Sequence, residues 1–189
     1  KIETRFLGIP SSTVKTVASL NKYDFDSEKM PMNKNELNLG RIRYSIDDES
    51  NLISIIEGNY KINDNINIPQ GFTVTIPSGT KFSFGSNATL ICHSNVLATG
   101  TKEEPITFTS INERWPGALF LDGSNKKSIF DYTTFENVSG IGSGPNISGL
   151  DRNGWTMTGG ITFFETNVSL ANCYFENFST EDSLNIISS

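Results

Sequence analysis

Short runs of β-branched and aromatic residues, separated by Gly, Asn, Ser and Pro, fill the chain from about residue 58 onward. Such runs, without sustained helical spacing, are typical of many short β-strands. The pattern predicts strands over residues 65–68, 72–76, 81–84, 89–93, 96–99, 106–109, 118–121, 128–137, 161–166, 169–177 and 184–187. Their spacing of about 8 to 12 residues suits a sandwich, a barrel or a β-solenoid.

The first 50 residues have a different sequence pattern, with much local charge and little sustained periodicity. We expect a lead-in or cap over residues 1–50, followed by a β domain over residues 51–189. Within the cap, the apolar spacing predicts a brief helix over residues 12–20 and one or two short strands between Leu37 and Ile46.

A phrase of six residues occurs twice, which favours a solenoid over the other two folds. Residues 134–139 (TFENVS) return later in the chain as residues 174–179 (YFENFS). We interpret the interval between the two phrases as two coils of a three-sided parallel β-helix. Stacked coils would place Phe135 and Phe175 in the core, and Asn137 and Asn177 in turns that share amide hydrogen bonds. A chance likeness between two hairpin strands of a sandwich is the alternative.

Composition narrows the function classes. The 189 residues carry a net charge of −6, one histidine and two cysteines, with 36% hydrophobic and 19% charged residues. An acidic chain without a dense Lys/Arg run argues against nucleic acid as a partner. The longest apolar runs are too short for a membrane span. Cys92 and Cys173 lie far apart in the chain, so we expect two free thiols rather than a zinc site or a Cys-x-x-Cys redox pair.

Two stretches carry a family resemblance. Residues 58–120 contain Ile76-Pro77-Ser78-Gly79-Thr80, then EPITFTS at 104–110 and WPGALF at 115–120; the second stretch is residues 153–189. The first resembles the secreted right-handed parallel β-helix proteins of bacteria, the pectate-lyase-like superfamily. The second is similar to β-helix segments associated with spore-coat-kinase-like (CotH) proteins. The resemblance implies an all-β fold, a right-handed parallel β-helix (β-solenoid) that forms the N-terminal part of a longer solenoid.

Carboxylates are the first candidates for catalysis, because β-helix enzymes that cut polysaccharides use acids gathered on one face, in some cases with calcium. The acids considered are Asp122, Asp131, Glu136, Asp151, Glu165, Glu176, Glu181 and Asp182. The repeat puts Glu136 and Glu176 on the same face, and the resemblance places an acidic position at Glu181 and Asp182. For Glu136 and Glu176 we favour the alternative, that they are the solvated end of an outward-facing strand; Glu181 and Asp182 have the better case for a site. The single histidine, His93, suggests no catalytic triad, and no metal site or cofactor is predicted.

Two tryptophans are candidates for binding. Trp115 and Trp155 both lie in loops with Gly or Pro, where an exposed indole could stack on a sugar ring. Asp151 and Arg152, beside Trp155, join them as binding candidates. The alternative is that each indole covers an edge of the core. We expect the Gly-rich segment at about 140–159 to be a loop excursion that forms one wall of a groove.

Three functions stay open. The first is an extracellular or cell-envelope module that binds a polysaccharide or cell-surface glycan, or serves as a scaffold, without a complete catalytic site. The second is the N-terminal half of a polysaccharide lyase or glycoside hydrolase. The third is a structural spike or adhesin repeat. Further β-helix coils or a fused domain are the expected protein partners.

Overall fold

A computed structural model describes residues 36–121, 126–141, 150–152, 155–157 and 159–187, with the side chains of 150–157 left aside. Within these ranges the chain forms β-strands joined by turns, and it contains no α-helix. The helix predicted over residues 12–20 lies outside them. Among the described residues, no helix has the length and apolar character needed to cross a membrane.

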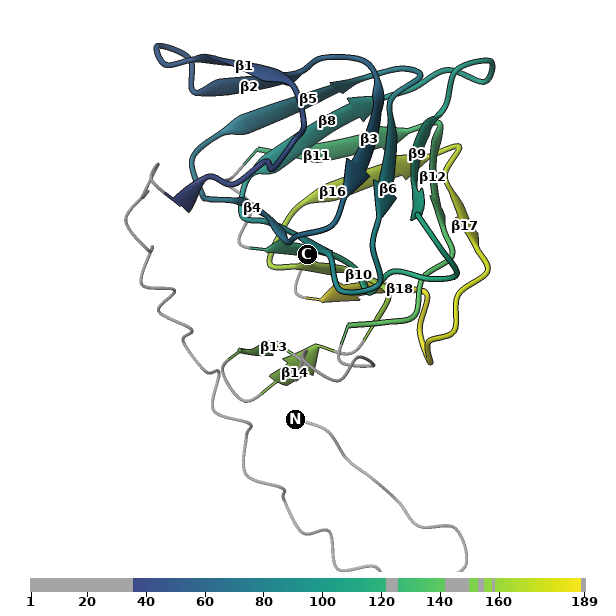
Figure 1. The fold of residues 1–189 in the computed structure, drawn as a ribbon. Coiled ribbons are helices and arrows are strands. Elements are labelled where there is room, and N and C mark those ends of the chain that lie inside the picture. The colour runs from purple at the N-terminus through teal and green to yellow at the C-terminus, as the bar shows by residue number, and fades with distance from the viewer. Residues whose placement is uncertain (1–35, 122–125, 142–149, 153–154, 158, 188–189) are drawn as a thin grey trace, which may run out of the picture. The chain divides into compact units, whose positions relative to one another are not determined.

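Three sheets surround one core (Figure 1). Sheet B contains β1 (Tyr44–Asp47), β2 (Leu52–Ile55), β5 (Thr73–Pro77), β8 (Asn95–Thr99), β11 (Ser128–Asp131) and β16 (Val168–Ala171). Sheet C contains β3 (Asn59–Ile62), β6 (Lys81–Phe84), β9 (Ile106–Ser110), β12 (Thr133–Glu136) and β17 (Tyr174–Glu176). Sheet A contains β4 (Ile66–Ile68), β7 (Thr89–Cys92), β10 (Gly117–Leu121), β15 (Ile161–Phe164) and β18 (Leu184–Ile187). A separate hairpin pairs β13 (Leu150–Arg152) with β14 (Trp155–Met157).

The chain visits sheets B, C and A in turn and then returns to B, so each circuit is one coil of a parallel β-helix. All strand pairs within the three sheets are parallel except β1 with β2. This topology confirms the predicted solenoid.

The interpretation of the repeat interval as two coils was wrong. Thr134, Phe135 and Glu136 pair directly with Tyr174, Phe175 and Glu176, so the two phrases lie in neighbouring coils. Earlier coils are shorter, since Leu52 pairs with Thr73. The fourth coil is longer because the chain leaves it between β12 and β15, the segment expected as an excursion.

Aromatic side chains stack through the core, one per coil. Tyr60, Phe82, Phe108, Phe135 and Phe175 form a column with ring centroids 5.7, 4.9, 4.9 and 5.4 Å apart. Parallel pairing in register places equivalent side chains above one another at about the strand spacing of 4.8 Å, which suits stacked rings. The predicted core positions of Phe135 and Phe175 are confirmed.

One end of the core is covered by residues that precede β1. Leu39 and Ile42 are buried in the main core cluster, and Asn38 forms an antiparallel bridge with Asn67 of β4. At the other end, the inward residues of the last coil are more exposed. Ile186 is 51% exposed, whereas its partner in β15, Phe163, is fully buried.

Candidate functional site

Trp115 is part of the core. Its side chain is fully buried, and its ring stacks on Phe84 with centroids 4.3 Å apart. The indole Nε1 donates a hydrogen bond of 3.0 Å to the carbonyl oxygen of Glu136. The indole of Trp115 is therefore not an exposed surface on which a sugar could stack. The alternative interpretation, that it covers an edge of the core, fits its buried position.

The structure brings Glu136 and Glu176 together. They are direct partners on β12 and β17, on the outward face of sheet C, where Glu176 is exposed and Glu136 half-buried. Like charges directly opposite each other on a sheet are destabilising. On the other side of β12, the paired strand β9 (ITFTS) contains no Asp or Glu, so no further acid extends the pair there. Both carboxylates belong to the solvated face of the sheet.

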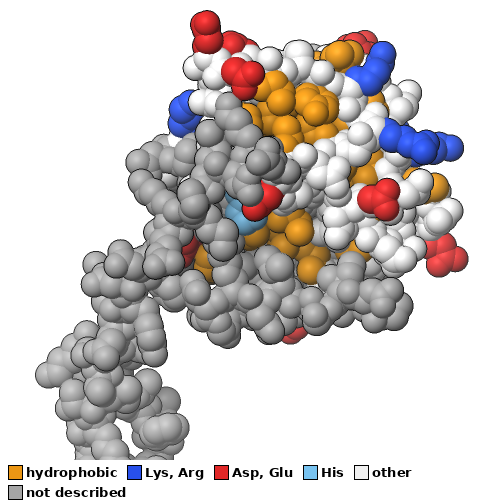
Figure 2. Space-filling model, turned by 60° about the vertical axis from the view of Figure 1, so that its left-hand side comes forward, with side chains coloured by type: hydrophobic (Ala, Val, Ile, Leu, Met, Phe, Trp, Pro, Cys, Tyr) orange, Lys and Arg blue, Asp and Glu red, His pale blue; other side chains and the backbone are white. Residues whose placement is uncertain are grey.

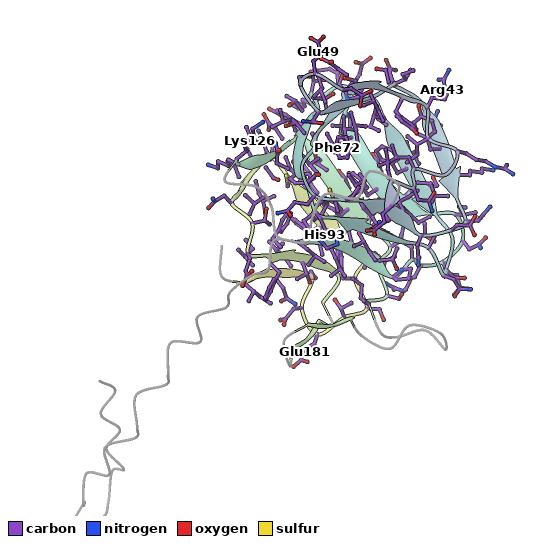
Figure 3. All side chains as sticks on the ribbon, turned by 90° about the vertical axis from the view of Figure 1, so that its left-hand side faces the viewer. Arg43, Glu49, Phe72, His93, Lys126 and Glu181 are labelled. Carbon is purple, nitrogen blue, oxygen red and sulfur yellow. The ribbon has the colours of Figure 1, made fainter. Side chains whose placement is uncertain are left out.

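The second acidic pair lies elsewhere. Glu181 and Asp182 are exposed in the turn between β17 and β18, where the Asp182 carbonyl accepts bonds from Gly160 N and Thr180 Oγ1. Figure 3 shows Glu181 at the lower rim of the molecule, away from His93. The four acidic candidates therefore form two separate pairs, one on a strand face and one in a turn.

Three binding candidates fall on the β13–β14 hairpin. Arg152 pairs with Trp155, and Asp151 with Thr156. Their side chains lie outside the described part of the structure, as does Asp122. Among the described residues, no group of three His, Cys, Asp or Glu side chains could hold a metal ion.

The described surface has a depression of about 330 Å³ at the corner where sheet B turns into sheet C. The residues that line it are Lys102, Pro105, Tyr132, Thr134, Asn172 and Tyr174. Its volume lies near the lower end of the range of small-ligand pockets, about 300 to 1,000 Å³. Of the lining residues, Lys102 alone is charged at neutral pH.

Unequal loops create this depression. In the third coil, a loop over residues 100–105 connects β8 to β9, and it stands out beside β9 in Figure 1. In the fourth coil, Tyr132 alone connects β11 to β12, and in the fifth, Asn172 and Cys173 connect β16 to β17. The long loop therefore rises as a wall beside the two tight corners that follow it.

Local hydrogen bonds hold the loop in shape. The Glu104 backbone N–H donates to Thr101 Oγ1 at 3.0 Å, and the Glu104 carbonyl accepts from Gly79 N at 3.0 Å and Thr101 N at 3.2 Å. Gly100 N donates to the Asp131 carbonyl at 2.9 Å. Because its backbone is bonded to the coils on both sides, this wall exists before any ligand binds.

The other side of the depression combines aromatic and amide groups. Alternation along β12 and β17 buries Phe135 and partly buries Phe175, and it turns Thr134 and its partner Tyr174 outward. Tyr174 is 59% exposed. Asn172 Nδ2 donates to the carboxylate of Asp131 at 2.8 Å, which leaves Asn172 Oδ1 available as an acceptor.

Sequence reasoning did not find this site. It predicted single strands over residues 128–137 and 169–177, whereas each stretch is two strands with a corner at Tyr132 or at Asn172-Cys173. The repeat did contain one signal. Thr134 in the first phrase is replaced by Tyr174 in the second, at a position that alternation turns outward.

On the face shown in Figure 2, basic side chains lie among acidic and uncharged ones.

No protein-family model matches the chain, and no curated protein or solved structure matches it either. The fold is therefore established by the strand topology alone, and the resemblance to pectate-lyase-like and CotH-associated β-helices stays a prediction.

Proposed function

We propose that this β-helix is an extracellular or cell-envelope module that binds a polysaccharide at the corner depression. The observation that carries the proposal is the exposed ring of Tyr174 beside a preformed wall. The C–H faces of a pyranose ring are apolar, so they stack on tyrosine, while its hydroxyls need hydrogen-bonding groups at the rim. Lys102, Thr134 and Asn172 supply those groups.

The same geometry favours binding over bond cleavage. Glycoside hydrolysis uses a pair of carboxyl groups that flank the scissile bond. None of the residues that line the depression is an acid, and the nearby Asp131 carboxylate accepts a hydrogen bond from Asn172. The acidic pair on sheet C belongs to the sheet face, and the pair before β18 belongs to a turn. A lyase or hydrolase site would need groups that these residues do not assemble.

A defined panel tests the proposal: cellohexaose, xylohexaose, chitohexaose, polygalacturonate and alginate, each titrated by calorimetry. We expect at least one member to bind, and the Tyr174→Ala variant to bind it at least about tenfold more weakly, a loss of about 1.4 kcal/mol. Tyr44→Ala is the matched control, because Tyr44 is also an exposed strand tyrosine, 40% accessible, on β1.

Three outcomes decide between the functions. Binding that Tyr174→Ala weakens and Tyr44→Ala does not supports the module. Release of reducing or unsaturated ends during the same incubations would point to the lyase or hydrolase alternative. No binding to any member would contradict the proposal and leave the structural spike or adhesin repeat as the better account.

A further inference from the structure

The corner beside the depression requires unusual backbone. Tyr132 has a φ of +45° and Asn172, in the next coil, a φ of +50°. The pairs Asp131–Ala171 and Thr134–Tyr174 flank both residues, so the two occupy equivalent corners. At each corner, one left-handed residue turns the chain sharply from sheet B into sheet C.

Asparagine tolerates this conformation, whereas a bulky side chain such as tyrosine disfavours it. Apart from glycine, the described residues with positive φ are Asn51, Tyr132, Asn137, Glu165, Asn172 and Asn177. All but Tyr132 and Glu165 are asparagine. A bulky residue at such a position persists only where its surroundings fix it.

The neighbouring coils do fix it. Tyr132 N donates to the Ala171 carbonyl at 3.1 Å, and the Tyr132 carbonyl accepts from Ile106 N at 3.0 Å. Gly100 lies against the same peptide, since a Cβ at Gly100 would stand 2.6 Å from the Tyr132 oxygen. The backbone at residue 132 is therefore set by coils on both sides, whatever side chain it carries.

We propose that Tyr132 is an affinity-determining residue of the depression, kept in a left-handed position at a cost in stability because its ring forms part of the binding wall. Disfavoured backbone conformations are found preferentially at functional sites, and here the disfavoured residue lines the depression together with Tyr174. Because the backbone that carries the ring is already fixed, binding of a sugar requires no ordering of the backbone at this corner, which favours affinity. This inference rests on the proposed function.

Opposite effects on stability and binding test it. In Tyr132→Asn, we expect the melting temperature to rise by about 2 to 4 °C, the shift expected when one disfavoured residue is relieved in a chain of this length. We expect its affinity for each panel glycan that binds the unaltered protein to fall about tenfold. Tyr132→Phe, which keeps the ring, should retain that affinity.

Glu165→Asn is the matched control, because Glu165 is the other described residue, besides asparagine and glycine, with a positive φ, at +50°. It lies after β15, at a different corner, so its replacement should raise the melting temperature without changing affinity. If Tyr132→Asn binds like the unaltered protein, or melts at a lower temperature, the inference is wrong while the proposed function stands. If the unaltered protein binds no panel member, both are wrong.

Discussion

Cys92 shows how burial in the stack controls the chemistry of one side chain. It lies in β7 between Ile68 and Phe120 of the neighbouring coils, it is fully buried, and its thiol is free, as predicted. Burial raises the pKa of the Cys92 thiol from an ordinary value of 9.0 to about 12, and the thiol donates a hydrogen bond to the Ser94 carbonyl. At neutral pH, Cys92 is therefore a protonated apolar core residue.

The raised pKa predicts a loss of stability in alkali. The folded state holds the Cys92 proton more tightly, so its contribution to stability is complete below pH 9 and decreases as pH rises from 9 toward 12. Relative to Cys92→Val, we expect the free energy of unfolding of the unaltered protein to fall by about 1.4 kcal/mol per pH unit in that window. Urea unfolding at pH 7, 9, 10 and 11 measures it. A difference between the two proteins that is constant with pH would contradict the prediction.

Individual side chains were the least predictable feature. The sequence places Trp115 in a segment with Pro and Gly, which is compatible with an indole pointing either way. Its inward position depends on Phe84, which lies a whole coil earlier. Tyr174 was overlooked for a related reason, because its place in a depression follows from the pleat of β17 together with a loop that lies two coils earlier.

At the scale of elements, the turns between sheets C and A are linked by asparagines. Asn177 Nδ2 donates to Asn137 Oδ1 at 2.6 Å, and Asn137 Nδ2 donates to Thr109 Oγ1 at 3.1 Å. Arg114 closes the series by donating to Asn177 Oδ1 at 2.9 Å. An amide hydrogen bond between Asn137 and Asn177 was predicted from the repeat and is confirmed.

Two substitutions at Asn137 separate its side chain from its backbone, which has a φ of +61°. Asn137→Gly removes the two amide bonds but tolerates the left-handed conformation, so we expect it to cost about 1 to 3 kcal/mol. Asn137→Ala adds about 1 kcal/mol of backbone strain to the same loss. Midpoints of urea unfolding give both values. If Asn137→Gly and Asn137→Ala lower the free energy of unfolding equally, the left-handed backbone at residue 137 does not contribute to the preference for asparagine there.

The strand register was predictable because equivalent residues of the two repeated phrases pair with each other in neighbouring coils. Phe135 above Phe175 follows from the two phrases alone. The length of a coil was not predictable, because residues inserted between β12 and β15 lengthen the repeat without changing which residues stack. Nor could periodicity locate the corner at Tyr132, where one residue interrupts an otherwise continuous strand pattern.

At the scale of the whole molecule, each coil contacts chiefly its two neighbours, as in other solenoids. A residue in an inner coil is packed from both sides, while an equivalent residue in the last coil is packed from one. Phe163 and Ile186 show this difference within one column of sheet A. Phe163 lies between Phe120 and Ile186 and is fully buried, whereas Ile186 is 51% exposed.

This asymmetry predicts that replacing a side chain of the column by alanine lowers the free energy of unfolding more in an inner coil than in the last coil. Phe163→Ala removes a ring that stacks on Phe120 at 4.8 Å and leaves a cavity, so we expect a loss of about 3 to 5 kcal/mol. Ile186→Ala removes a side chain that is already half in water, and we expect a loss below about 1 kcal/mol. Urea unfolding followed by tryptophan fluorescence measures both. A cost for Ile186→Ala as large as that for Phe163→Ala would mean that a second layer covers the last coil in solution, which sedimentation of the unaltered protein would then reveal as a dimer.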